Sequence, residues 1–413
     1  VAQIERPHQT SMHCGNRANP AICCVLLILL QACFALGLLN FRNWPRKQPF
    51  VTQKNMQSGS DQLDQGVSAI SGFSEIVENY DGFILDQFGV LHDGSTSLPG
   101  AAECLQQLHS AGKKLVILSN SSRGSLFTLN RLPSYGLDDK LLIGAITSGE
   151  EACKYIIQNR LDQLKCVLFS WNGWDQESSG LQELAENGLQ FSGPDEADFI
   201  LAHGTQVIVT GCEDHKLLET GYMKSGDLSH YLPILEVAAK RGIPLICANP
   251  DFLVNLPDGS QGFMPGNLSR KYREMGGNSI EFGKPHKEHF QACVQLLGIE
   301  ADRVVHVGDS LHHDIVGATA AGIDSVLIAS GIHAADLMLE TASADSPGAQ
   351  AVAAGVEEKE QAAAVAGGAA SWVPSTPISG KGAGLSMRVN SLVEREGLAA
   401  LCQPTWVTPL FQF

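Results

Sequence analysis

Two acidic residues of this sequence follow short apolar runs. Asp86 stands in FILDQFGVLHDG and Asp309 in RVVHVGDSLHHDIVGATAAG, with Asp314 five residues later. A carboxylate at the tip of a strand can attack a phosphoryl group, and a pair of carboxylates offers the hard oxygen ligands that Mg²⁺ prefers. His312 and His313 intervene, but an oxygen-rich set argues against zinc. The pattern predicts magnesium-assisted phosphoryl transfer.

Two further segments could hold a phosphate. KLVILSNSSRG ends its apolar run at Ser119 and Asn120, whose polar groups suit a phosphate oxygen at a strand-to-helix turn. In EFGKPHKEHF, Lys284 precedes Pro285, which we expect in the first turn of the next helix. That geometry would point a compact cation at the anionic centre.

Each of these segments also has an ordinary structural explanation. Asp86 could simply stabilise the turn after its strand, Ser119 could cap a helix, and Lys284 could be a solvated surface charge. All four, however, occur in this order at the ends of predicted strands. Ligands of open parallel sheets bind beyond the carboxyl ends of the strands, so the joint occurrence favours the chemical interpretation.

The elements that would position these groups alternate between strand and helix. In the first half of the chain, a helix-length amphipathic run, LPGAAECLQQLHSAG, lies between two short apolar runs, FILDQF and KLVILSN. In the second half, the amphipathic run HKEHFQACVQLLGI is accompanied by the short apolar runs PLICANPD, RVVHVGD and DSVLIAS. This alternation predicts an α/β fold with a parallel sheet and helices on both faces. A second α/β domain, inserted into the first, is predicted from three further strand candidates, KCVLFSW, ADFILAHG and QVIVTG, and from helical stretches near 180–187 and 227–241.

These patterns divide the chain as follows. We expect a core domain made of 73–136 and 249–333, with 137–248 as the inserted domain. Residues 340–384 are rich in Ala and Gly and are predicted to be a disordered insertion. Residues 385–413 are apolar again and are expected to pack back on the core as a terminal helix and strand.

Residues 1–72 are predicted to be an N-terminal extension with a linker. Within it, residues 21–39 (AICCVLLILLQACFALGLL) are uncharged and long enough, at about 28 Å of helix, to cross a bilayer. Three readings stay open: a membrane anchor, a cleaved targeting peptide, and upstream sequence ahead of a true start at Met56. Arg42, Arg46 and Lys47 would keep the body of an anchored protein in the cytoplasm.

Charge and cysteine content exclude other classes. Of the net charge of −16, residues 1–60 contribute +5, which leaves −21 for the remainder. So acidic a body is a poor match for a nucleic-acid backbone, and we expect no nucleic-acid partner. The 11 cysteines show no C-x-x-C spacing, which argues against a zinc site and for reduced thiols inside the cell.

The four segments together resemble the motifs of the haloacid dehalogenase-like (HAD) hydrolase superfamily. The resemblance covers about residues 73–333 and includes the continuation G-V-L-x-x-G, the long insertion and A-N-P-D at 248–251, which are similar to the class IIA branch. That branch contains sugar-phosphate, nitrophenyl-phosphate and pyridoxal-phosphate phosphatases. The residues that carry the motifs are Asp86-x-Phe88-Gly89-Val90-Leu91, Ser119-Asn120, Lys284-Pro285 and Gly308-Asp309-x-x-x-x-Asp314.

The resemblance implies a Rossmann-like core with a C2-type cap, and possible homodimers formed through that cap. It implies Asp86 as the nucleophile and Mg²⁺ held by Asp86, Asp309 and the Phe88 carbonyl, with Asp314 as a weaker or indirect ligand. The residues implied to contact the substrate are Ser119 and Lys284 at the phosphate, Asn120 in support, and Asn249 and Asp251 at the cap junction, where N-P-D could equally be a plain turn.

Phe88 departs from the family pattern. Phosphatases of the superfamily usually carry there an Asp that acts as general acid and base. Side chains two apart on a strand face the same way, so Phe88 is predicted to face the site without a proton to give. General acid–base catalysis contributes roughly 10²–10⁴ in rate. His92 and Asp93 are the nearby candidates to replace the missing acid.

The leading functional prediction is a Mg²⁺-dependent phosphatase that acts on a small phosphorylated metabolite through an aspartyl-phosphate. Dehalogenase chemistry would also fit an aromatic residue at position 88, but those enzymes need no metal, and Asp309 and Asp314 are retained. The alternative is a catalytically weakened HAD-fold protein that binds a phosphorylated ligand in a regulatory role.

Overall fold

A computed structural model describes residues 67–173, 180–211, 216–256, 260–334, 336–337, 382–402 and 404–413. The predicted segment 21–39 and nearly all of the predicted insertion 340–384 lie outside the described residues. Helix α12 (Gly382–Arg395) includes the last three residues of that insertion, so the predicted boundary was too late there. Within the described residues, no helix combines the length and apolar character needed to cross a bilayer.

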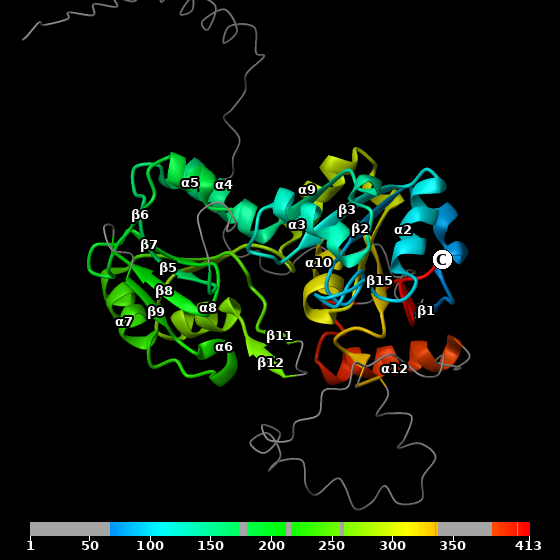
Figure 1. Cartoon of the computed structure of the whole chain (residues 1–413). Helices are drawn as coiled ribbons and strands as arrows, with labels where there is room; N and C mark the ends of the chain where they lie inside the picture. The colour runs from blue at the N-terminus through cyan, green and yellow to red at the C-terminus, as the bar shows by residue number, and fades with distance from the viewer. Residues whose placement is uncertain are drawn as a thin grey trace, which may run out of the picture. The chain divides into compact units, whose positions relative to one another are not determined.

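The core domain is built on a parallel sheet of seven strands (Figure 1). Neighbouring strands pair in the order β1-β16-β15-β14-β2-β3-β4. The strands are β1 (Ser68–Ala69), β2 (Gly82–Leu85), β3 (Lys114–Ser119), β4 (Gly144–Thr147), β14 (Val304–Gly308), β15 (Asp324–Ile328) and β16 (Trp406–Thr408). This order places the ends of β14, β2 and β3 side by side, and Asp309, Asp86 and Asn120 follow these three strands.

Alternating side chains cover both faces of this sheet. Phe83 and Leu85 of β2 pack in one apolar cluster with α2 (Ala101–Ser110). Ile84 packs on the opposite face with α9 (Lys287–Leu297) and α10 (Val316–Ala321). All three strand residues are fully buried, which explains why the strand is apolar throughout, as expected for a sheet covered on both faces.

The cap domain has a mixed sheet ordered β13-β10-β7-β5-β8-β9, with β6 beside β5. Strand β8 runs antiparallel to both of its neighbours, β5 and β9, and the other pairs of this sheet are parallel. Helices α4 (Ser148–Arg160) and α5 (Gln182–Glu186) pack on one face. Helices α6 (Tyr222–Ser225), α7 (Leu232–Arg241) and α8 (Pro265–Glu274) pack on the other. The strands are β5 (Lys165–Ser170), β6 (Gln190–Phe191), β7 (Phe199–Ala202), β8 (Val207–Thr210), β9 (Lys216–Glu219), β10 (Leu245–Cys247) and β13 (Ser279–Glu281).

The predicted α/β class is confirmed, but strand pairing divides the two domains at other residues than the sequence pattern did. Strand β4, predicted in the cap at 137–248, pairs with β3 of the core sheet. Strand β13, predicted in the core at 249–333, pairs with β10 of the cap sheet. A hairpin of β11 (Leu253–Asn255) and β12 (Gln261–Phe263) also precedes β13. The hydropathy pattern predicts where a strand lies but not which strand it pairs with, and this explains both differences.

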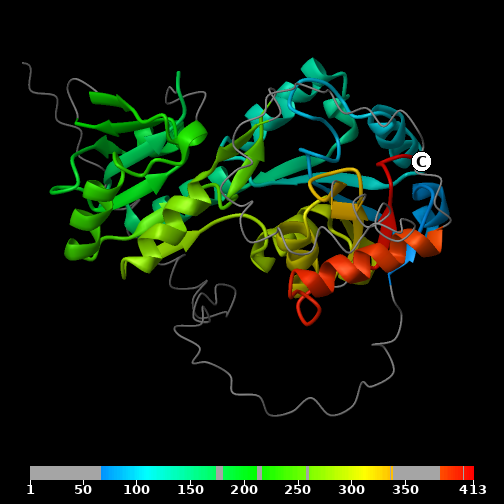
Figure 2. The same cartoon turned by 90° about the horizontal axis from the view of Figure 1, so that it is seen from below.

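The C-terminal segment completes the core. Strand β16 lies between β1 and β15 and is parallel to both. Helix α12 packs its apolar side against Leu327 of β15 and Val407 of β16, and Figure 2 shows it lying beside the core domain. Residues from the two ends of the described chain therefore form one edge of the sheet that carries the site.

Candidate active site

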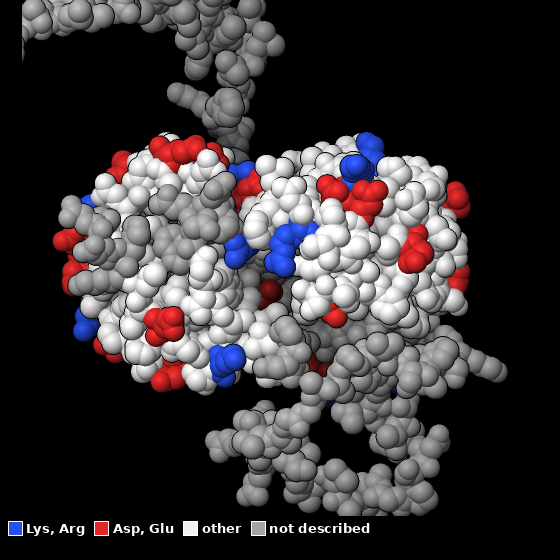
Figure 3. Space-filling model, in the orientation of Figure 1, with Lys and Arg blue, Asp and Glu red and all other residues white. Residues whose placement is uncertain are grey.

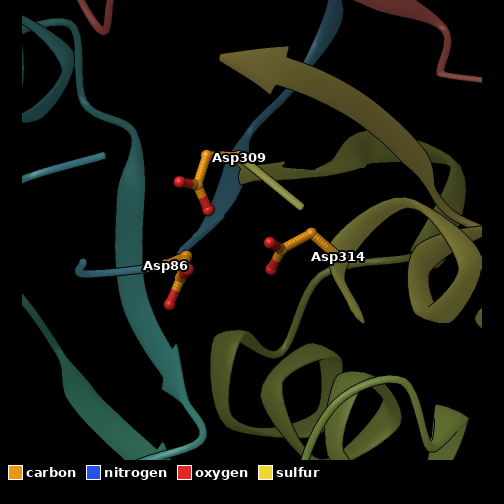
Figure 4. A group of neighbouring side chains, drawn as sticks. All are labelled: Asp86, Asp309 and Asp314. Carbon is orange, nitrogen blue, oxygen red and sulfur yellow. The ribbon is translucent and has the colours of Figure 1, made fainter. Parts of the chain in front are cut away.

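Asp86, Asp309 and Asp314 come together at the carboxyl end of the core sheet. Asp86 follows β2, Asp309 follows the paired strand β14, and Asp314 lies in the helical turn Leu311–Ile315 that comes next. Their carboxylates turn towards one another in Figure 4. One oxygen of each lies within 4.8 Å of the others, and all three residues are buried. On the face drawn in Figure 3, acidic atoms lie at the base of a hollow.

Lys284 joins two of these carboxylates. Its Nζ lies 2.7 Å from Asp86 Oδ1 and 2.7 Å from Asp314 Oδ1, and its side chain is only 3% exposed. An ammonium has three donors, so one N–H of Lys284 remains for a ligand. Pro285 precedes α9, which begins at Lys287; the predicted place of Pro285 in the first helical turn is therefore wrong, and Lys284 lies in the loop before the helix.

The three carboxyl groups of the cluster differ in the direction in which their pKa values are shifted. Burial raises the pKa of Asp86 to about 7, against the attraction of Lys284. Burial and repulsion by Asp86 raise the pKa of Asp309 well above its usual range. Burial also opposes ionisation of Asp314, but Lys284 and His306 outweigh it and lower its pKa. Lys284 thus forms ion pairs with Asp86 and Asp314, whereas Asp309 has no ion pair among the described residues.

This donor set fits a hard divalent cation. Three buried carboxylates offer oxygen ligands only, and Mg²⁺ is held by one or two carboxylates together with waters and phosphate oxygens. The raised pKa values of Asp86 and Asp309 are those of carboxylates whose ionised form needs a nearby positive charge. The geometry therefore suits Asp86 and Asp309 as ligands better than Asp314, whose oxygens already accept several hydrogen bonds.

Two glycines make room for Asp309. A Cβ atom at Gly89 or at Gly331 would overlap the Asp309 side chain. Gly89 also has a φ of 81°, a left-handed conformation that L side chains rarely adopt. Asp309 Oδ2 accepts a hydrogen bond of 2.9 Å from the Ile332 backbone N–H, next to Gly331. Tight backbone on both sides thus fixes the carboxylate.

Asn120 ties the phosphate segment to the Lys284 loop and the cap junction. Its Oδ1 accepts from the Lys284 backbone N–H at 2.6 Å, and its Nδ2 donates to Asp251 Oδ1 at 2.7 Å. Asn249 is buried, and its Oδ1 accepts from the Asp251 backbone N–H at 3.0 Å. Ser119 is buried at the end of β3 and accepts from the Ser121 N–H at 3.2 Å.

Phe88 is half-buried beside the ring of His92, with ring centroids 6.2 Å apart. His92 stacks on Tyr135 at 4.2 Å and its Nδ1 accepts from the Gly94 N–H. Burial and Arg131 lower the pKa of His92 to about 4, so the ring is uncharged at neutral pH. This arrangement argues against His92 as a substitute proton donor.

Asp93, the other candidate to replace the missing acid, is also held in a role that does not suit a proton donor. Its Oδ1 accepts hydrogen bonds from the backbone N–H groups of Ser95 and Thr96. Burial is slight, and these two bonds lower the pKa of Asp93. The side chain is an ionised turn cap. Neither candidate therefore replaces the acid that Phe88 lacks.

His306 is a site residue that the sequence analysis missed. It lies in β14, is fully buried, and places its Nε2 2.8 Å from Asp314 Oδ1. Burial lowers its pKa, so the neutral ring can donate Nε2–H to the carboxylate. The signal in the sequence was a single polar residue inside the apolar run Val304–Val307.

Comparisons with known proteins agree with this geometry. Residues 83–189 and 234–322 match two family models described as haloacid dehalogenase-like hydrolase, and residues 281–365 match a HAD-hydrolase-like model. An acid sugar phosphatase of Staphylococcus haemolyticus is 24% identical over 261 residues, 62% of this chain and 88% of the relative. Chronophin of Bos taurus is 25% identical over 267 residues, 62% and 84% of the two chains.

Solved structures give the same fold. A haloacid dehalogenase-like hydrolase from Brucella suis 1330 superposes with a TM-score of 0.53 at 24% identity and covers 65% of this chain and 92% of its own. A possible sugar phosphatase from Cytophaga hutchinsonii gives 0.51 at 21% identity, with 67% and 95% covered. These solved structures show the fold of the chain. The family models and the phosphatase relatives identify it as a haloacid dehalogenase-like, phosphatase-type hydrolase that is similar to the class IIA branch.

Proposed function

We propose that this protein is a Mg²⁺-dependent phosphatase of small phosphorylated metabolites that works through an aspartyl-phosphate on Asp86. The observation that carries the proposal is the buried cluster in which Lys284 contacts Asp86 while Asp309 lies beside it. A nucleophilic carboxylate, a fixed cation and an oxygen-ligand set are the parts that phosphoryl transfer requires.

The chemistry needs two displacements. An oxygen of Asp86 forms a bond to phosphorus while the bond from phosphorus to the leaving oxygen breaks, and the leaving oxygen takes a proton from solvent. Water then attacks the phosphorus, which releases phosphate and restores the Asp86 carboxylate. Bound Mg²⁺, held by Asp86, Asp309 and the Phe88 carbonyl, would offset the negative charge of the carboxylates and the phosphate.

The remaining residues hold the substrate. Lys284 has one donor left for a phosphate oxygen, and Ser119 ends the neighbouring strand β3 with its hydroxyl. Asn120 keeps the Lys284 loop in place through the Lys284 N–H. Asp251 and Asn249 lie at the junction with the cap and are proposed to face the rest of the substrate. Dimerisation through the cap stays a prediction, as does anchoring by residues 21–39.

The test is turnover of 4-nitrophenyl phosphate with and without Mg²⁺. We expect Mg²⁺-dependent release of nitrophenol, and loss to background in Asp86→Asn, because the amide keeps the shape but lacks the nucleophilic charge. Asp309→Asn should weaken Mg²⁺ binding in calorimetry, and the exposed Asp302→Asn should leave both measurements unchanged. Turnover by Asp86→Asn at the wild-type rate would contradict the covalent mechanism. Tight phosphate binding without any turnover would contradict the phosphatase itself.

A further inference from the structure

His306 stands in an unusual place for an imidazole. It is fully buried on the face of the core sheet that packs against α9, and its ring meets that of Phe290 at 4.9 Å and 79°. The residues around it on this face are apolar, among them Ile84, Val304 and Cys293. A buried polar ring is unfavourable there unless it is hydrogen-bonded, so packing alone does not explain a histidine.

The hydrogen bond that His306 makes leads directly to the active site. Its Nε2 lies 2.8 Å from Asp314 Oδ1, the same oxygen that lies 2.7 Å from Lys284 Nζ. Gly308, two residues further on the same face of β14, makes the approach feasible, because any Cβ there would overlap the Asp314 side chain. Asp314 Oδ2 accepts from the Ser310 N–H at 3.0 Å.

Asp314 therefore has three donors from three parts of the core. His306 comes from strand β14, Ser310 from the turn after it, and Lys284 from the loop before α9. A carboxylate has about four acceptor positions, so Asp314 is almost saturated and its orientation is fixed. Through Lys284 Nζ, this orientation also fixes the distance from the ammonium to Asp86.

We infer that His306 is a positioning residue of the phosphoryl-transfer site. It donates Nε2–H to Asp314 and holds that carboxylate where it shares Lys284 with Asp86. The inference rests on the proposed function for the roles of Asp86 and Lys284. Without the His306 donor, Asp314 has only Lys284 and Ser310 to balance its charge, and it draws the ammonium away from the nucleophile.

The experiment compares three variants. His306→Leu fills the space without a donor, His306→Gln places an amide N–H where Nε2–H was, and Phe290→Leu changes the packing beside His306 without touching Asp314. Each is measured for Mg²⁺ affinity by calorimetry and for kcat and KM with 4-nitrophenyl phosphate. Partners that orient metal-site carboxylates typically change affinity or activity by about 10–100-fold.

We expect His306→Leu to lower kcat and Mg²⁺ affinity by about tenfold or more with little change in KM. His306→Gln should stay within about threefold of wild type, and Phe290→Leu should leave both quantities unchanged. Equal losses of kcat and Mg²⁺ affinity in His306→Leu and His306→Gln would show a packing role and overturn the inference. A comparable loss in Phe290→Leu would have the same meaning. Wild-type values in His306→Leu would do the same.

Two readouts separate this inference from the phosphatase proposal. If wild-type protein binds Mg²⁺ but hydrolyses nothing, the phosphatase proposal fails, while the order of Mg²⁺ affinities still decides the role of His306. If His306→Leu does not fold, ¹⁵N-histidine NMR of the wild-type protein decides, with the His306→Gln spectrum for assignment. The Nε2–H tautomer of His306 supports the inference, and the Nδ1–H tautomer overturns it.

Discussion

At the residue scale, Phe88 is predicted to decide which phosphates the proposed phosphatase cleaves easily. Its half-buried ring stands two residues after Asp86, and neither His92 nor Asp93 offers a proton in its place. Leaving groups of low basicity, such as phenolates, carboxylates and phosphates, depart without a proton, whereas a sugar alkoxide needs one. Aryl phosphates, acyl phosphates and phosphoanhydrides are therefore the expected good substrates.

The prediction for Phe88 is a change in leaving-group dependence. Wild-type rates across a series of aryl and alkyl phosphates should fall steeply as the pKa of the leaving group rises. Phe88→Asp should flatten this dependence and raise alkyl-phosphate turnover by up to about 10²-fold, because the new carboxyl can donate a proton. Phe88→Leu is the control, since it removes the ring without adding an acid. Efficient hydrolysis of alkyl phosphates by the wild type would show that another acid is present.

At the scale of elements, the turn after β2 serves the site through its backbone. Gly89 allows Asp309 to approach, and Asp93 caps the turn with two backbone hydrogen bonds. His92 accepts from the Gly94 N–H and stacks on Tyr135. The residues that could have supplied proton transfer are thus used to hold the turn.

His92 gives this turn a defined pH dependence. Its pKa is lowered from 6.5 to about 4 by burial and by Arg131, so between these pH values the unfolded chain binds more protons than the folded protein. The stabilisation is complete above about pH 6.5 and is lost as the pH falls towards 4, by at most about 1.4 kcal/mol per pH unit.

The matched variant is His92→Asn, whose side-chain oxygen can still accept from Gly94. Urea unfolding of both proteins between pH 7 and pH 4.5 should show that the stability advantage of the wild type shrinks as the pH falls. The difference between the proteins is the useful quantity, because Asp86, with its raised pKa of about 7, changes stability in the opposite direction in both. A difference that stays constant over this range would show that His92 is not buried as a neutral ring.

At the scale of the whole molecule, the C-terminal segment is part of the core that holds the site. Strand β16 lies inside the sheet, and α12 covers β15 and the turn Leu311–Ile315 that carries Asp314. Leu392 of α12 is 1% exposed in this cluster, whereas Leu401 is 57% exposed. The segment from α12 to β16 is therefore expected to contribute to folding.

Leu392→Ala should lower the free energy of unfolding by about 2–5 kcal/mol, because it removes a buried side chain and leaves a cavity. Leu401→Ala makes the same chemical change on the surface and should stay within about 0.5 kcal/mol of wild type. Chemical denaturation of the three proteins measures both values. Equal stability of the two variants would mean that α12 does not pack on the core.

The sequence alone determined the class of the fold and predicted the chemistry of the site. Asp86, Ser119 and Asp309 were predicted as site residues because each ends or follows an apolar strand, and the carboxyl ends of neighbouring parallel strands lie at one edge of a sheet. Lys284 follows β13 of the cap sheet, so its place beside Asp86 does not follow from this rule. The HAD resemblance added the C2-type cap and the predicted role of Asp86 as nucleophile, and it correctly named the superfamily.

Only the tertiary structure decided which distant groups touch. Strand β4 joined the core and β13 the cap because pairing depends on non-local packing that hydropathy does not encode. The failure of His92 and Asp93 as acids depends on burial and on backbone partners in one turn. The contact of His306 with Asp314 exists because Gly308 lets a later turn fold back over β14. Such hydrogen bonds follow from three-dimensional proximity, and no spacing in the chain specifies them.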